Sequence, residues 1–135
     1  MNLDNFKRQH ETIKRQMEDI ETALILTNIR NDAFQISLKI SRLAGTILVH
    51  LKAEDDFLYP TLRRSTNSNT RITSERLQNE MGNLAKDFLN YKQTYQSASR
   101  IASQPEKFLI ETKAMFLALR NRLETEDSEL YALLQ

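Results

Sequence analysis

Apolar side chains recur every three or four residues along four long stretches of the chain, which is the spacing that places them on one face of an α-helix. We expect helices over residues 4–28, 32–63, 74–101 and 105–133. Short connections between four long helices favour an antiparallel arrangement. The pattern therefore predicts an all-α fold, an up-down-up-down four-helix bundle that forms a single domain over residues 1–135.

Clusters of turn-forming polar residues separate the four stretches. The breaks are residues 28–32, the run from Ser65 to Thr70, and residues 103–105. Ser103 and Glu106 have the spacing of a capping box, in which each side chain accepts a hydrogen bond from the backbone of the other residue. We therefore expect a loop from Ser65 to Thr70 and a fourth helix that Ser103 caps.

Polar side chains interrupt the apolar stripes at related positions. They are His10 near the start of the first stretch, His50 and Glu54 towards the end of the second, and Arg122 and Glu126 towards the end of the fourth. Residues four apart share one helix face, and in an up-down bundle these levels fall at the same end. The sequence therefore predicts one polar cluster inside the bundle, made of these five residues.

The second and fourth stretches contain an internal repeat without gaps. The segment from His50 to Tyr59 aligns with the segment from Arg122 to Tyr131, and leucine, glutamate, aspartate, leucine and tyrosine are shared at matching places. The offset is about the length of one helical hairpin, the unit of such bundles. The repeat indicates that the two halves of the chain are related, and it predicts that Tyr59 and Tyr131 pack in equivalent ways.

Composition narrows the function classes. Two glycines and two prolines are too few for the turns of an all-β fold or for a glycine-rich phosphate loop. Without cysteine the chain forms no disulfide and no thiolate metal site. The formal charge of +1 lacks the basic excess of a dedicated nucleic-acid-binding protein. No apolar run has the pattern of a signal peptide or a membrane span, so we expect a cytoplasmic protein without nucleic-acid or membrane partners.

These residues together resemble the hemerythrin family in its bacterial form, the HHE cation-binding domain. The most specific piece is the motif His-x-x-x-Glu-Asp-x-x-Leu-Tyr-Pro at residues 50–60, and the resemblance spans essentially the whole chain. It implies a four-helix bundle that holds two iron ions near one end, through histidines from all four helices and two bridging carboxylates. Members of the family bind oxygen, or sense oxygen, nitric oxide or iron.

The resemblance assigns ligands to one half of such a site. His10 and His50 match the histidines of the first two helices. Glu54 matches the bridging carboxylate of the second helix, and Glu126, or its neighbour Asp127, matches that of the fourth.

The other half of the site departs from the family's pattern. Met81 and Arg122 stand where the third and fourth helices should offer histidines, and Ala85 offers no ligand one turn after Met81. A thioether is a poor ligand for hard iron, and a guanidinium cannot be deprotonated to become one. We therefore expect Arg122 to replace the charge of the second metal, in an ion-pair network with Glu54 and Glu126.

The expected function is that of a non-enzymatic, hemerythrin-like binding or sensing module with an incomplete di-iron site. It would hold at most one iron or other divalent metal at His10, His50, Glu54 and Glu126, or none, and a bound metal would take O2 or NO as its ligand. The alternative, which Arg122 favours, is a metal-free regulatory adaptor that binds another protein.

Two further functions are weighed against these. The first is an ordinary di-iron, oxygen-binding hemerythrin, which the loss of two expected histidines disfavours. The second is a histidine phosphotransfer domain, which needs an exposed histidine, whereas His50 lies on the core stripe.

Overall fold

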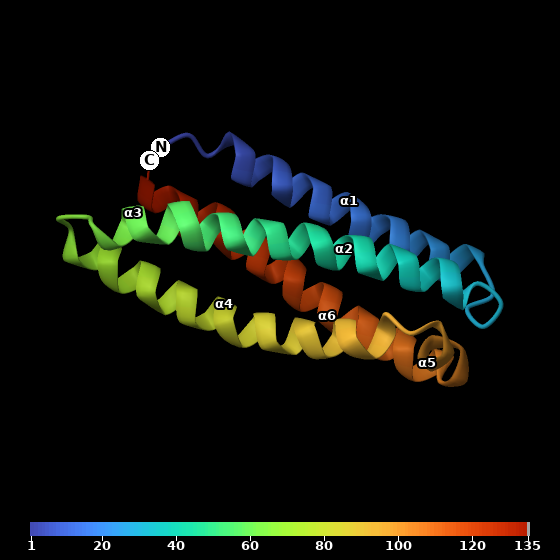
Figure 1. Cartoon of the computed structure of the whole chain (residues 1–135). Helices are drawn as coiled ribbons and strands as arrows, with labels where there is room; N and C mark the ends of the chain where they lie inside the picture. The colour runs from blue at the N-terminus through green and yellow to red at the C-terminus, as the bar shows by residue number, and fades with distance from the viewer. Residues whose placement is uncertain (135) are drawn as a thin grey trace.

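The computed structural model describes residues 1–134 as four long helical segments, each of which runs antiparallel to the one before it (Figure 1). The first is α1 (Asp4–Leu26). The second is α2 (Ala33–Ala53), which continues through the π-helical turn η1 (Glu54–Leu58) into α3 (Tyr59–Arg63). The third is α4 (Ser68–Tyr95), followed by the short α5 (Ala98–Ser103). The fourth is α6 (Pro105–Thr125), which continues into the π-helical turn η2 (Glu126–Leu130) and the 3₁₀ turn η3 (Tyr131–Leu134). The all-α bundle predicted from the apolar pattern is confirmed.

The third segment differs most from its predicted bounds. α4 begins at Ser68, inside the run that the sequence predicts as a loop, and it ends at Tyr95 rather than near residue 101. The side chain of Asn67 caps it by accepting hydrogen bonds from the backbone N–H groups of Asn69 and Thr70, at 2.9 and 3.3 Å. Asn, Ser and Thr side chains bond the backbone in turns and at helix N-termini alike. The polar run was therefore compatible with either structure.

The remaining helix ends lie close to their predicted positions. α1 ends at Leu26 and α6 begins at Pro105. The predicted capping box is wrong, because Gln104 occupies the N-cap position of α6 without a capping side-chain hydrogen bond, and the Ser103 hydroxyl donates to the backbone carbonyl of Arg100. Pro105 suits the first helical position, where a backbone N–H would have no partner inside the helix.

Two apolar clusters fill the interior and leave a polar layer between them. Along α1 the smaller cluster includes Phe6 and the larger one begins at Ile13; along the second segment the larger cluster reaches Ile47 and the smaller begins at Leu58. Between these limits lie the buried polar residues His10, His50 and Glu54. The layer lies towards the end of the bundle where both chain termini are found (Figure 1).

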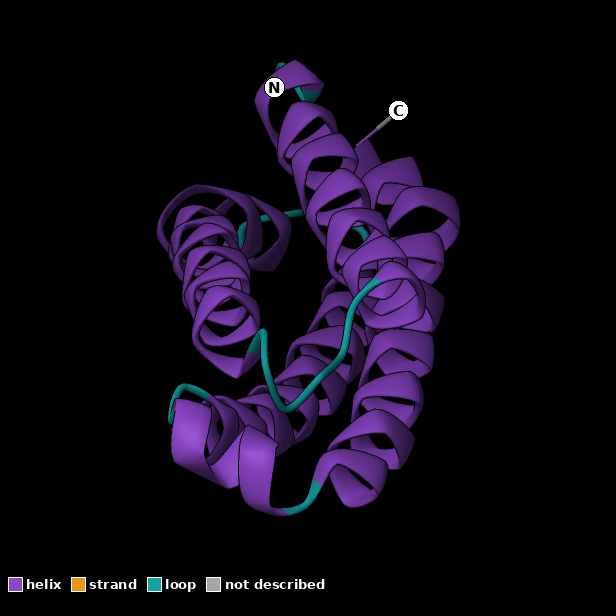
Figure 2. Ribbon diagram, turned by 90° about the vertical axis from the view of Figure 1, so that its right-hand side faces the viewer, coloured by secondary structure: helices purple, strands orange, loops and turns teal. Residues whose placement is uncertain are grey.

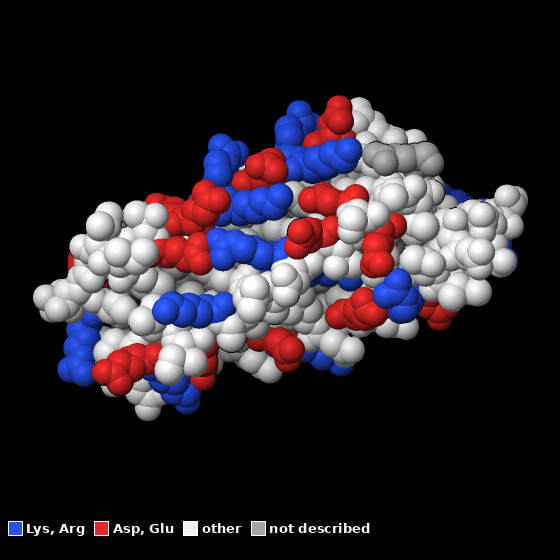
Figure 3. Space-filling view, turned by 180° about the vertical axis from the view of Figure 1, so that it is seen from behind, with Lys and Arg blue, Asp and Glu red and all other residues white. Residues whose placement is uncertain are grey.

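The four segments surround this interior and are joined by short loops (Figure 2). Ion pairs tie neighbouring segments on the outside: Arg120 of α6 bonds Glu21 of α1, and Lys39 of α2 bonds Asp19 of α1. Basic and acidic side chains are interspersed on the face that Figure 3 shows, rather than gathered by sign. Within residues 1–134, none of the helices combines the length and the apolarity needed to cross a membrane.

Candidate metal centre

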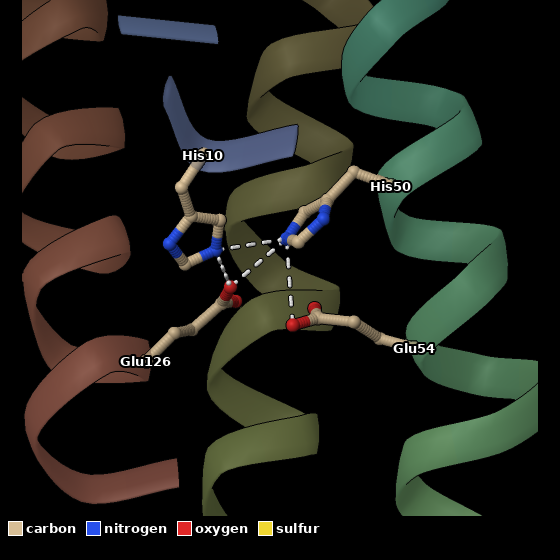
Figure 4. Close-up of side chains that lie close together, drawn as sticks. All are labelled: His10, His50, Glu54 and Glu126. Carbon is tan, nitrogen blue, oxygen red and sulfur yellow. Dashed lines mark hydrogen bonds and ion pairs between the residues drawn. The ribbon is translucent and has the colours of Figure 1, made fainter. Parts of the chain in front are cut away.

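Four titratable side chains from three of the long segments converge in the polar layer (Figure 4). His10 projects from α1 and His50 from the last turn of α2, while Glu54 and Glu126 are the first residues of η1 and η2. One possible ligand atom from each lies within 4.8 Å of the others, and all four residues are buried. The structure thus brings together the four residues that the sequence predicts as metal ligands.

Each of the two glutamates begins a π-helical turn. η1 and η2 occupy matching places in the internal repeat, and π-helical turns of this kind occur frequently at functional sites. Each glutamate follows a buried nitrogen side chain by four residues. His50 Nε2 lies 3.4 Å from Glu54 Oε2, and Arg122 Nε lies 2.8 Å from Glu126 Oε2. Each half of the repeat therefore supplies one carboxylate and one nitrogen side chain.

The inner nitrogen atoms of the two histidines are crowded by polar neighbours. His10 Nε2 lies 3.1 Å from His50 Nε2, 2.8 Å from Glu126 Oε1 and 2.9 Å from Tyr131 Oη. His50 Nε2 lies 3.0 Å from the same Glu126 oxygen. A ring nitrogen offers one hydrogen or one lone pair, so hydrogen bonding cannot satisfy all these contacts at once. A cation placed among these atoms would satisfy them together.

The outer ring nitrogens are held by hydrogen-bond acceptors. His10 Nδ1 donates to Asp127 Oδ1 at 2.9 Å, and His50 Nδ1 donates to Gln9 Oε1 at 2.7 Å. A proton on Nδ1 leaves the lone pair of a neutral imidazole on Nε2, which faces the cluster. Carboxylate and carbonyl partners orient metal-binding histidines in this way. Asp127 therefore supports His10 from outside, while its neighbour Glu126 points inward.

Arg122 pairs with one of the two glutamates that the sequence assigns to it. The side chain is only 7% exposed, and it donates from Nε to Glu126 Oε2 at 2.8 Å and from Nη2 to Tyr59 Oη at 2.9 Å. Within residues 1–134 it makes no hydrogen bond or ion pair with Glu54. Arg122 Nη1 and Glu54 Oε1 are both buried without a hydrogen-bond partner among these residues.

Tyr131 is the site residue that sequence reasoning missed. Its hydroxyl donates to Glu54 Oε2 at 2.9 Å and lies at the same distance from His10 Nε2. Tyr59 and Tyr131 are both buried, as the repeat predicts, but their hydroxyl groups have different partners, since that of Tyr59 accepts from Arg122. The repeat was the available signal, because it places each tyrosine five residues after an inward-facing glutamate.

The buried groups shift one another's pKa values. Burial alone lowers the pKa of His50, but its bonds to Glu126 and Glu54 outweigh burial and raise that pKa to about 9. Burial raises the pKa of Glu54 to about 7, against the opposing effect of its bond to His50. Burial also favours a higher pKa for Glu126, but hydrogen bonds from His10 and His50 and the charge of Arg122 hold it well below its usual range. Without metal, the cluster at neutral pH therefore contains an imidazolium, a guanidinium and one firmly ionised carboxylate.

The third long segment contributes packing rather than a ligand to this cluster. Met81 of α4 is 7% exposed and borders a cavity of about 20 Å³ that Arg122 and Glu126 also line. A cavity of this size holds about one water molecule. In the part of the chain that the structure describes, α4 adds no histidine or carboxylate to the buried group.

A comparison of the sequence with known protein families agrees with this fold. Residues 1–134 match the model described as the hemerythrin HHE cation-binding domain. The chain belongs to this family. No curated protein and no solved structure matches the chain significantly. The hemerythrin-like bundle predicted from the sequence is thus confirmed.

The donor set of this hemerythrin domain fits one metal ion. Imidazole nitrogens and carboxylate oxygens are ligands that iron and other divalent transition metals accept. Metal–ligand bonds of about 2.0–2.2 Å place neighbouring ligand atoms roughly 2.8–3.6 Å apart. The inner contacts from His10 to Glu126 and from His50 to Glu54 measure 2.8 and 3.4 Å, which lies in that range.

The other side of Glu126 is occupied by a cationic side chain. Its outer oxygen accepts a hydrogen bond from the guanidinium of Arg122. Arg122 has no lone pair to offer a metal, and the thioether of Met81 is a poor ligand for hard iron.

Proposed function

We propose that this hemerythrin domain binds one transition-metal ion, iron in the first instance, through His10, His50, Glu54 and Glu126. We propose further that it serves as a binding or sensing module rather than as an enzyme. The observation that carries the proposal is the orientation of the two imidazoles. Asp127 and Gln9 accept hydrogen bonds from the outer nitrogens, so that in the neutral imidazoles that a metal requires, both inner lone pairs would face the two carboxylates.

The position of Arg122 supports the binding of one metal ion per chain rather than two. Its guanidinium lies 2.8 Å from Glu126 and remains charged at every accessible pH. Two unit charges about 4 Å apart repel by about 4 kcal/mol at an effective dielectric constant of about 20, and a divalent ion would be repelled more strongly. The guanidinium thus supplies at the second position the positive charge that a second iron would supply.

A bound metal would supply a coordination position for a small ligand such as O2 or NO. The residues of the chain contribute exclusion of water, because apolar clusters lie on both sides of the polar layer and all four ligands are buried. A small uncharged ligand suits such surroundings better than an ion does, since a charge loses its hydration there.

A metal-free adaptor is the second candidate, and the buried ion pairs favour it. Arg122 and the imidazolium of His50 both neutralise Glu126, so part of the cluster is satisfied without any metal. In that case the polar layer would only stabilise the bundle, and another protein would be the partner.

Metal affinity in matched variants separates the two candidates. We expect Fe(II), titrated without oxygen against a competing chelator, to bind the unaltered protein and to bind His50→Ala at least 100-fold more weakly. Lys52→Ala, a change at an exposed residue two positions along the chain, should leave the affinity unchanged. Failure of the unaltered protein to bind Fe(II) would favour the adaptor.

A further inference from the structure

The hydroxyl of Tyr131 lies among the candidate ligand atoms rather than behind them. We propose that its oxygen is a fifth donor to the metal. This inference rests on the proposed function, because it requires a metal at the four histidine and glutamate side chains.

Distances and burial support a donor role. Tyr131 Oη lies 2.9 Å from His10 Nε2 and 2.9 Å from Glu54 Oε2, two ligand atoms that come from different helical segments. Both separations fall in the roughly 2.8–3.6 Å range expected between neighbouring atoms of one coordination shell. Tyr131 is fully buried, and its ring packs against the imidazole of His10 with the ring centres 5.2 Å apart. Its oxygen is therefore fixed at the same centre as the other donors.

The equivalent tyrosine of the repeat provides a contrast. Tyr59 stands five residues after Glu54, as Tyr131 stands five after Glu126. Its hydroxyl accepts a hydrogen bond from Arg122 Nη2 at 2.9 Å, which ties its oxygen to the guanidinium. Of these two tyrosines, Tyr131 is the one whose oxygen lies among the candidate ligand atoms.

Coordination of an ion that is already ferric needs no further reactant. The phenol O–H bond of Tyr131 breaks, its proton passes to solvent, and an oxygen–iron bond forms. Where the protein is loaded with Fe(II), each ion first gives one electron to an added oxidant, for which we name ferricyanide.

Visible absorption tests the inference directly, because a phenolate bound to ferric iron absorbs visible light through charge transfer from oxygen to metal. The unaltered protein, Tyr131→Phe and Tyr59→Phe are loaded with Fe(II) without oxygen, oxidised with ferricyanide and desalted, and iron is quantified in each. We expect the band in the unaltered protein and in Tyr59→Phe. Tyr131→Phe should retain about one iron per chain and lose the band.

Several outcomes would overturn the inference. A ferric protein that lacks the band, or a Tyr131→Phe variant that keeps it, shows that the phenol oxygen is not a ligand. If Tyr131→Phe fails to fold, resonance Raman spectra of the ferric Tyr59→Phe variant with ring-deuterated tyrosine decide instead, since only a bound phenolate gives enhanced bands that shift on deuteration. An unaltered protein without iron contradicts the proposed function itself, which distinguishes the two failures.

Discussion

Arg122 lies buried between Glu126 and Tyr59, and the consequence of removing its charge follows from that position. Breaking one side of a buried ion pair leaves the other charge without compensation. We expect Arg122→Gln to lower the free energy of unfolding of the metal-free protein by about 3–5 kcal/mol, measured by urea denaturation.

A surface arginine offers the matched control for this change. Arg76 pairs with Glu80 four residues later, and both side chains are about half exposed. Arg76→Gln should cost less than about 1 kcal/mol, because exposed pairs are screened by water. Equal losses in the two variants would show that Arg122 does not neutralise a buried carboxylate.

Asp127 supports His10 through the outer ring nitrogen, so its removal should weaken metal binding without removing a ligand. We expect Asp127→Ala to lower metal affinity by about 10–100-fold, the usual effect of losing such a supporting group. Asp55 is the control, because it occupies the matching place in the repeat and yet accepts its hydrogen bond from Gln78. If Asp55→Ala and Asp127→Ala weaken binding alike, the orientation of His10 does not depend on Asp127.

The protons that the metal-free cluster holds predict how metal affinity depends on pH. The pKa values of His50 and Glu54 are raised to about 9 and about 7, so both groups are protonated well below those values. A metal must displace these protons, and its apparent affinity therefore rises with pH. We expect the rise to be steepest below about pH 7, where both protons compete, and to level off above about pH 9. Chelator-buffered titrations measure this, and a pH-independent affinity would contradict it.

At the scale of the helices, the start of α4 depends on a single cap. Asn67 accepts hydrogen bonds from two backbone N–H groups that would otherwise lack a partner. We expect Asn67→Ala to lower the free energy of unfolding by about 0.5–2 kcal/mol. Asn90→Ala, at an exposed position within the same helix, should not lower it, because alanine favours helix interiors. A loss at Asn90 that matches the loss at Asn67 would contradict the assigned cap.

The positions of the helices could be predicted from apolar spacing, whereas their ends could not. The stripe through Phe6, Ile13 and Ile20 is required by burial, since only one face of α1 meets the core. Ends depend on local competition among polar side chains. Asn67 and Ser103 are both residue types that commonly cap helices, yet of these two only Asn67 does so.

The candidate ligands could be predicted for a related reason. Helical levels place His10, His50 and Glu126 at one end of the bundle, and the structure brings them together. The π-helical turns could not be read from the sequence, because a single turn with i→i+5 hydrogen bonds leaves no clear mark on the apolar spacing. Tyr131 directly follows η2, and its contact with Glu54 was missed.

For the molecule as a whole, the site links three of the four long segments. α1, the second segment and the fourth each contribute at least one candidate ligand, while α4 contributes Met81 to the packing beside them. In the proposed metal-bound state, residues remote in sequence would share one metal, which would couple the docking of these segments. The family's usual pair of irons is reduced in this account to one metal and one guanidinium.

The iron content of each chain tests this account most directly. The protein is loaded with Fe(II) without oxygen, desalted and analysed for iron, together with the Met81→His, Arg122→His double variant, which restores the two missing histidines. We predict about one iron in the unaltered protein and about two in the double variant. Two irons in the unaltered protein would contradict the assigned role of Arg122, and none would contradict the metal site.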